Sequence, residues 1–154
     1  MIHGMWHQKV LTACALTCAV LMGSDKKAVQ PAGSSVAGPY TPGIIANGTL
    51  YVAGQVGRDA KTGRIPENFE DEVAQTLENI NLIMKEAGYT FADAVAVQVY
   101  LTDIELFQRM NQVYMKYFPE PRPARTTVGI SKLVGTARIE ITVIAYRKDC
   151  GKKK

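Results

Sequence analysis

Apolar residues recur at helical spacing in two segments of the chain. Over residues 70–87 they step by four and three positions and so share one helix face: Val73, Leu77, Ile80, Met84 and Ala87. Gly88 follows directly and is a typical helix terminator, because glycine adopts the left-handed conformation without strain. After a capping-box pattern from Thr102 to Glu105, the second segment shows the same stepping: Leu106, Met110, Val113 and Tyr117. The pattern predicts two amphipathic helices.

Alternating and β-branched residues predict strands elsewhere. Residues 94–101, AVAVQVYL, place four apolar side chains on one face of a strand: Val95, Val97, Val99 and Leu101. Residues 48–57, GTLYVAGQVG, are rich in β-forming residues and predict a strand. Asn47-Gly48 is a strong hairpin signal, so the preceding GIIANG is predicted to be the other arm of a hairpin that turns at this pair. Residues 126–130 and 137–147 supply the last two strands.

The predicted order β-β-α-β-α-β-β is an α+β fold, in which two helices cover one face of a mixed sheet. The other face is not polar either, since it would carry Tyr51, Ala53, Ala96, Tyr100, Ile144 and Tyr146. An apolar sheet face of this kind needs a cover, and the simplest cover is another copy of the same chain. The pattern therefore predicts an oligomer.

The net charge of +4 is concentrated at the C-terminal end. Residues 147–154, RKDCGKKK, hold five basic residues and one acidic residue, which leaves 13 of each sign in residues 1–146. A short basic tail either solubilises the chain or binds polyanions. Because the body is neutral, no nucleic-acid partner is expected. The length predicts one domain, residues 37–147, with a leader or linker at 1–36 and a basic tail at 148–154.

Cysteine and histidine occur only near the two ends. The cysteines are Cys14, Cys18 and Cys150, and the histidines are His3 and His7. The body therefore has no thiol nucleophile, no imidazole acid or base, and none of the softer ligands that zinc prefers. A metal site is not expected there.

The first 36 residues include an apolar run at 10–23, preceded by one firm positive charge, Lys9. The run is too short to span a bilayer comfortably and resembles the hydrophobic region of a secretory signal peptide. LTAC, ending at Cys14, also resembles a lipobox, whose cysteine would carry a lipid anchor. A disordered extension or a start codon placed too far upstream explains the same residues. Localisation therefore stays open between export and the cytoplasm.

Three residues of the body are candidates for a functional site. Arg125 opens a strand after a proline-rich loop, Glu140 lies within the strand RIEITVIAY, and Tyr40 lies between two prolines in AGPYTPG. A carboxylate within a sheet is costly unless it is paired or has a function. Each residue also has a structural interpretation: a surface charge for Arg125, a salt bridge to Arg138 or an exposed strand face for Glu140, and loop packing for Tyr40. Spacing alone leaves both interpretations open.

Five motifs follow one another between about Ala37 and Tyr146: the GPY turn, the AGQ strand, the DxxxFxxMNxxY helix, the PART junction and the final IEI strand. In this order and spacing they resemble the RidA (YjgF/YER057c/UK114) family. The resemblance implies a chorismate-mutase-like fold. It also implies a homotrimer whose sheets face inward and form a barrel, with a site at each subunit interface.

The resemblance further implies an activity and its residues. Such proteins hydrolyse reactive enamines and imines, such as 2-aminoacrylate, to 2-keto acids and ammonia, with no metal or organic cofactor. By motif position, Arg125 corresponds to the arginine that binds the substrate carboxylate, Glu140 to the glutamate that positions the water, and Tyr40 to the site tyrosine. Asn111 and Gly54 correspond to further substrate-binding positions.

Other functions remain open beside this one. The same clefts could hold a small carboxylate without turnover, as a binding or chaperone-like module, or act on another imine. An endoribonuclease is the weakest alternative, because the body is neutral and lacks paired histidines. The chain also departs from the family pattern: Ala53 replaces a frequent serine, Thr127 a frequent cysteine, and Thr142 a second glutamate. Thr127, two residues after Arg125, is therefore a candidate for determining which substrate is bound.

Overall fold

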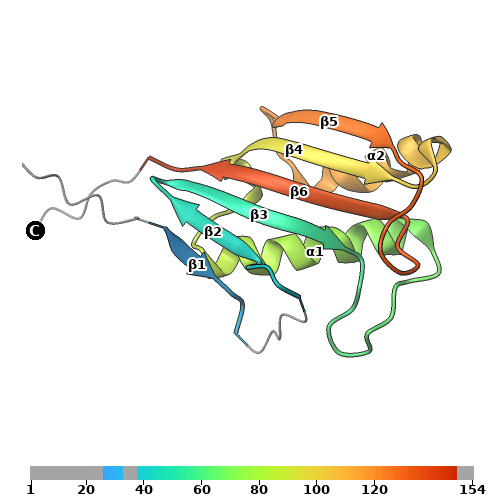
Figure 1. Ribbon diagram of the computed structural model, residues 1–154. Helices are drawn as coiled ribbons and strands as arrows, with labels where there is room; N and C mark the ends of the chain where they lie inside the picture. The colour runs from blue at the N-terminus through green and yellow to red at the C-terminus, as the bar shows by residue number, and fades with distance from the viewer. Residues whose placement is uncertain (1–25, 33–37, 149–154) are drawn as a thin grey trace, which may run out of the picture.

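The part of the chain that the structure describes forms a six-stranded mixed sheet with both long helices on one face (Figure 1). The computed structural model describes residues 26–32 and 38–148. The strands are β1 (Lys27–Val29), β2 (Gly43–Ala46), β3 (Thr49–Val56), β4 (Ala94–Leu101), β5 (Ala124–Gly129) and β6 (Ile139–Tyr146). The helices are α1 (Phe69–Glu86) and α2 (Phe107–Tyr117), and short 3-10 turns cover Phe91–Asp93 and Ile104–Leu106. The predicted α+β class is confirmed.

The strand order across the sheet is β1-β2-β3-β6-β4-β5. Every neighbouring pair is antiparallel except β4 and β5, which run parallel and are connected through α2. Strand β6, the last of the described strands in sequence, thus lies between β3 and β4 near the middle of the sheet. Strand β5, which carries Arg125, forms one edge.

Strand β1 is an element that the sequence did not predict. It lies inside residues 1–36, which the pattern assigned to a leader or linker, and pairs antiparallel with β2 as the other edge strand. Its three residues are too few to show an alternating pattern, although Val29 is buried in the core. The sheet therefore begins earlier than expected. The apolar run at 10–23 and the cysteines lie outside the described residues.

Two turns confirm their sequence signals. Asn47 and Gly48 both have positive φ, 49° and 73°, as a type I′ hairpin turn requires. Gly88, with φ of 78°, ends α1. Its N–H donates to the Lys85 carbonyl, and the next N–H, from Tyr89, donates to the Met84 carbonyl. This pair of bonds is a Schellman motif, which satisfies carbonyls at the helix end.

Two local predictions are wrong. Thr102 does not cap the second helix: Asp103 accepts from the Glu105 N–H and caps a 3-10 turn, after which α2 begins at Phe107. Val95 does not join the core face of β4, and its side chain is 48% exposed. A register irregularity between Ala94 and Ala96 opposite β6 puts Ala94 on the buried side instead. Neither a bulge nor the choice between neighbouring capping residues is visible in hydrophobic spacing.

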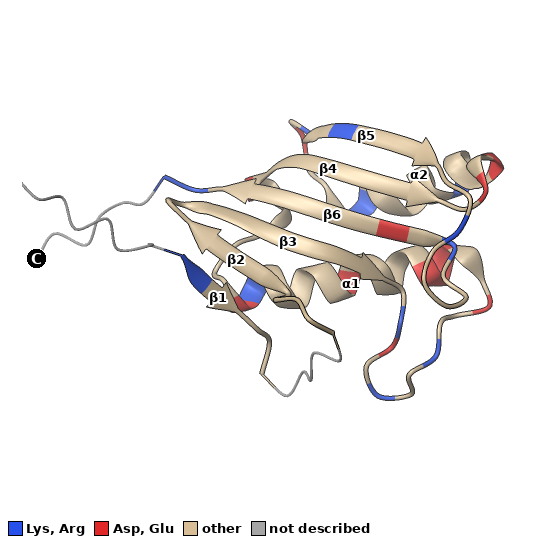
Figure 2. Cartoon of the chain, viewed as in Figure 1, with Lys and Arg blue, Asp and Glu red and all other residues tan. Residues whose placement is uncertain are grey.

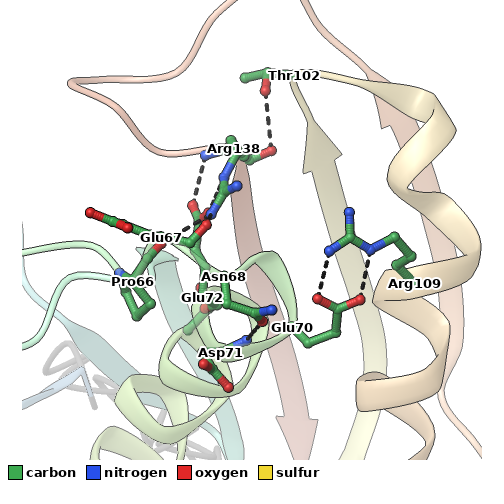
Figure 3. Close-up of polar contacts among 10 residues, drawn as sticks. Pro66, Glu67, Asn68, Glu70, Asp71, Glu72, Thr102, Arg109 and Arg138 are labelled. Carbon is green, nitrogen blue, oxygen red and sulfur yellow. Dashed lines mark hydrogen bonds and ion pairs between the residues drawn. The ribbon is translucent and has the colours of Figure 1, made fainter.

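A buried ion pair ties α1 to the start of β6 (Figure 3). The Glu72 carboxylate is fully buried and accepts from the Arg138 N–H at 2.7 Å and from its Nε at 2.6 Å. A second guanidinium nitrogen, Nη2, donates to the carbonyls of Pro66 and Glu67, each at 3.0 Å. Such a charge is tolerated in the interior because it is fully hydrogen-bonded. Arg138 is therefore committed to Glu72, and the alternative of a salt bridge between Arg138 and Glu140 is wrong.

The sheet face opposite the helices is largely uncharged (Figure 2). The strand register places Tyr51, Ile144 and Ala96 in one row across β3, β6 and β4. Their neighbours along the strands, such as Val143 and Val97, are buried on the helix side, so the row lies on the open face. Tyr51 and Tyr146 are each about half exposed. The predicted apolar outer face is present in the single chain.

Candidate functional site

Arg125 lies on the helix side of the edge strand β5. Its register partner on the parallel strand β4 is Val97, which is buried, so Arg125 points toward α2. The guanidinium carbon stands 4.6 Å from the centroid of the Tyr114 ring and 5.5 Å from that of Phe107. Both distances fall within the range of cation–π attraction. Arg125 is therefore held on an aromatic surface rather than extending freely into solvent.

The sequence of α2 supplies that surface. Phe107, Asn111 and Tyr114 are spaced by four and three residues and so share one side of the helix. Tyr114 is buried, and its hydroxyl has no hydrogen-bond partner among the described residues. Burial raises the pKa of Tyr114, while the charges of Arg125 and Arg122 act in the opposite direction. A raised pKa keeps the phenol neutral at neutral pH.

A surface cleft of about 420 Å³ opens beside this group. Two of the predicted residues, Asn111 and Arg125, line it together with Gln108, Tyr114, Met115, Arg122 and Pro123. No carboxylate lines the cleft, and Arg125 has no carboxylate partner among the described residues. A planar guanidinium offers two parallel donors that match a carboxylate. The cleft is suited to binding a small carboxylate.

Glu140 lies on the opposite face of the sheet. Its neighbours Ile139 and Ile141 are fully buried on the helix side, so its side chain projects from the open face, beside Val56 and Tyr100 in register. No hydrogen bond or ion pair to the Glu140 side chain occurs within the described part of the chain. Its carboxylate is therefore available to a water molecule or a ligand.

Gly54 makes room for that carboxylate. The pairing of β3 with β6 shifts register between Val52 and Gln55, so β3 bulges at this point. A methyl group on Gly54 would lie 1.9 Å from Glu140 Oε1 and 2.8 Å from its carboxyl carbon. The Gln55 side chain donates to the carbonyls of Ala53 and Gly54, at 3.0 and 3.1 Å, and so stabilises the bulge. The close approach predicted for Gly54 is thus made by Glu140.

Tyr40 lines a second cleft, of about 280 Å³, between the end of β3 and α1. The other lining residues are Pro31, Pro42, Gly54, Gln55, Val56, Arg58, Ala60, Asn79, Leu82 and Ile83. Tyr40 is more than half exposed, so it is not simply packed into the loop. Gly54 lines this cleft and also lies against the Glu140 side chain. Tyr40 therefore borders the same cleft as the β3 bulge.

The predicted site residues consequently fall into two groups within one chain. Arg125 and Asn111 lie beside α2 on the helix side of the sheet, whereas Glu140 projects from the open side next to Gly54. Thr127 follows Arg125 on the same side of β5, and its buried hydroxyl lacks a hydrogen-bond partner among the described residues. It does not line the Arg125 cleft, and its role in substrate choice stays a prediction.

Sequence reasoning missed three kinds of site residue. The aromatic residues Phe107 and Tyr114 were visible as the F and Y of DxxxFxxMNxxY, but only the asparagine of that motif was given a role. On the open face, the Tyr100 hydroxyl donates to Gln98 Oε1 at 2.9 Å, and Thr142 donates to the same oxygen at 3.4 Å. Strand alternation placed Tyr100 on this face but gave no hint of the polar cluster. Arg122 had no signal beyond its place in the proline-rich loop.

No group of three or more His, Cys, Asp or Glu side chains gathers within residues 26–32 and 38–148 in a way that could hold a metal ion. Neither α1 nor α2 is long and apolar enough to cross a membrane.

Known proteins share both this fold and these motifs. The family model described as Endoribonuclease L-PSP matches residues 31–147. A RutC family protein of Pyrococcus horikoshii is 45% identical over 112 residues, 72% of this chain and 89% of that protein. A Bos taurus protein named 2-iminobutanoate/2-iminopropanoate deaminase is 37% identical over 111 residues, 71% of this chain and 81% of that protein.

Solved structures of similar proteins have the same fold. RidA from the Antarctic bacterium Psychrobacter sp. has a TM-score of 0.73 and 32% identity, covering 79% of this chain and 99% of its own. E. coli TdcF with bound serine has a TM-score of 0.72 and 30% identity, covering 79% and 98%. With a family model over most of its length and relatives of this similarity, the chain belongs to the RidA/YjgF/RutC (L-PSP) family.

Proposed function

We propose that the protein hydrolyses small imines and enamines that carry a carboxylate, giving a 2-keto acid and ammonia. The observation that carries the proposal is Arg125: its guanidinium rests on two aromatic rings, lines a cleft and has no carboxylate partner in the described chain. The bovine relative is named as a deaminase of this kind, and the E. coli relative was solved with serine, which has a carboxylate. No organic cofactor enters the proposed reaction.

The proposed site forms between copies of the chain in a homotrimer. Arg125 and Glu140 lie on opposite sides of one sheet, so a single copy does not present both to one small substrate. The half-exposed tyrosines of the open face supply the apolar surface that a second copy would bury. With the sheets facing inward, Glu140 of one copy would meet Arg125 of the next.

The proposed reaction uses only a few side chains of the protein. The substrate carboxylate binds Arg125, with Asn111 beside it, and so fixes the position of the imine carbon. Glu140 accepts a hydrogen bond from water, which adds to that carbon and gives a tetrahedral carbinolamine. Transfer of a proton to nitrogen then releases ammonia and leaves the keto acid. Tyr40 borders the site from the loop before β2. Since imines already hydrolyse in water, orientation and one acid–base group suffice.

The test uses imines generated in place by an amino-acid oxidase and trapped with semicarbazide. We expect the wild-type protein to suppress trapping and Arg125→Ala to lose this effect. Arg109→Ala is the matched control. It also removes one arginine, from α2, but this arginine pairs with Glu70 and does not line the cleft. Arg125→Ala with wild-type suppression would refute the assignment. Keto-acid binding without suppression would instead favour the non-catalytic binding module.

A mixing experiment tests the shared site. Arg125→Ala and Glu140→Gln copies are each expected to be inactive, but some interfaces of a mixed trimer pair an intact Arg125 with an intact Glu140. We expect activity to return when the two variants are unfolded and refolded together, and not when each is refolded alone. No recovery in verified mixed trimers would show that Arg125 and Glu140 do not share a site across the interface between copies.

Ribonuclease activity is the weaker proposal, although the family model is described by that name. Residues 31–147 contain no histidine, the residue that most often serves as acid or base at neutral pH.

A further inference from the structure

The cleft that holds Arg125 contains a second arginine, Arg122. The two are separated by Pro123 and Ala124, so their Cα atoms lie at most about 10 Å apart. The positive charges of Arg125 and Arg122 each act to lower the pKa of Tyr114, so both guanidinium groups lie near this residue. Arg125 rests on the Tyr114 ring. The other lining side chains are neutral. The cleft is thus more positive than a single carboxylate requires.

Arg122 already has a partner, but an exchangeable one. The Glu120 carboxylate accepts from the Arg122 backbone N–H at 3.2 Å and from its guanidinium. Both side chains are well exposed, Glu120 by 68% and Arg122 by 41%, and Glu120 does not line the cleft. Exposed ion pairs contribute little because water competes for both charges. A ligand carboxylate inside the cleft can therefore replace Glu120 on the guanidinium.

The two arginines differ in how they are held. Arg125 is fixed on the rings of Tyr114 and Phe107, whereas Arg122 comes from the proline-rich loop before β5. A fixed cation suits the carboxylate next to the reacting carbon, whose position matters most for the chemistry. A more adaptable cation at the cleft edge suits a second carboxylate farther along the ligand.

We propose that the preferred substrates are imines of dicarboxylic amino acids, with the carboxylate beside the imine carbon on Arg125 and the side-chain carboxylate on Arg122. The reaction is the one proposed above, on which this inference rests: water adds to the carbon of the C=N bond, the C–N bond breaks, and a 2-oxodicarboxylate and ammonia form. Arg122 takes no part in bond making. It determines which substrate is bound.

The activity test compares imines made in place from aspartate or glutamate with the imine made from alanine. We expect wild-type kcat/KM to favour the dicarboxylic imines by at least about tenfold, as one added charge-assisted contact allows. Arg122→Gln should lose most of that preference. Lys116→Gln removes the same charge from the exposed end of α2 but not from the cleft, and should keep it. Glu120→Gln, which removes the competing carboxylate, should increase the preference severalfold.

An equal kcat/KM ratio in wild type and Arg122→Gln would overturn the inference while leaving imine hydrolysis standing. If no turnover occurs, binding of the product keto acids tests the role of Arg122 separately from the proposed imine hydrolysis. Calorimetry with 2-oxoglutarate and pyruvate should then show tighter binding of the dicarboxylate, lost in Arg122→Gln and kept in Lys116→Gln. That result would support Arg122 as the arginine that binds the second carboxylate, although the proposed hydrolysis had failed. Equal affinities for the two ligands would reject it.

Discussion

Gly54→Ala should separate the placement of Glu140 from the stability of the fold. The added methyl would lie 1.9 Å from Glu140 Oε1, whereas ordinary contacts begin at 3.4 Å, so the oxygen must move by about 1.5 Å. The atoms in conflict, Oε1 and the carboxyl carbon, form the end of a flexible side chain on the open face, and none of the nearest atoms belongs to the backbone. Gly54 does not have positive φ, so alanine suits its backbone.

The two energy terms that affect folding nearly cancel. Replacing glycine by alanine at a compatible position stabilises a protein by about 0.4–1 kcal/mol through the unfolded chain. Moving the Glu140 side chain away from its preferred rotamer costs about 0.5–1.5 kcal/mol. We therefore expect the free energy of unfolding to stay within about 1 kcal/mol of wild type. Activity should fall about 100-fold, because a displacement of about 1 Å at a reacting group costs that much.

Urea unfolding and the semicarbazide assay measure the two quantities on the same preparation. Gly57→Ala is the control, since its methyl would lie 2.5 Å from the Glu72 backbone oxygen, which cannot rotate away. We expect that variant to lose stability clearly. Wild-type activity in Gly54→Ala would show that turnover does not depend on where Glu140 lies. A loss of more than about 3 kcal/mol in Gly54→Ala would instead show that this close approach is structural.

Three further predictions follow from the described contacts. Glu72→Ala leaves a half-buried arginine without its partner and should lower the free energy of unfolding by about 3–5 kcal/mol in urea titrations; a loss below about 1 kcal/mol would contradict this. Tyr114→Leu removes a ring beneath Arg125 and should raise KM roughly three- to thirtyfold, whereas Tyr114→Phe keeps the ring and should stay near wild type; equal KM values in both variants would exclude a cation–π role. The hydrogen bond from Arg109 lowers the pKa of Glu70 from 4.5 to about 2, so the stabilisation is complete above pH 4.5 and is lost as pH falls toward 2. Glu70→Gln should flatten acid unfolding curves over that range, and an unchanged acid slope would refute the pairing.

Hydrophobic spacing predicted the elements whose patterns repeat over several turns or residue pairs. Both helices, the Asn47-Gly48 hairpin and the two-faced sheet emerged from it, because burial on one side imposes the period of each element. The features that hydrophobic spacing did not predict are determined by single residues or very short segments. Strand β1 is too short to have a period, and the irregularity at Val95 changes which residues face the core without changing composition.

For the candidate site, the sequence supplied a set of residues, whose roles stay predictions, but not their arrangement. Motif positions named Arg125 and Glu140, yet only the strand register shows that they project from opposite sides of the sheet. The pairing of Arg138 with Glu72, 66 positions apart in sequence, likewise needs the folded chain to be seen. Long-range partners of charged residues leave no local signature, which is why the shorter alternative, Arg138 with Glu140, was plausible from spacing.

The central place of β6 has a consequence for synthesis on the ribosome. A nascent chain that has not yet reached Ile139 possesses β3 and β4 but lacks the strand between them, so its sheet is in two pieces. Those unfilled edges are the kind to which chaperones and aggregating neighbours bind. The same late strand carries Glu140, so a prematurely terminated product would lack the sheet centre and the proposed water-binding carboxylate together. Completion of the sheet and of the proposed site would thus depend on one segment, the last of the described strands to be made.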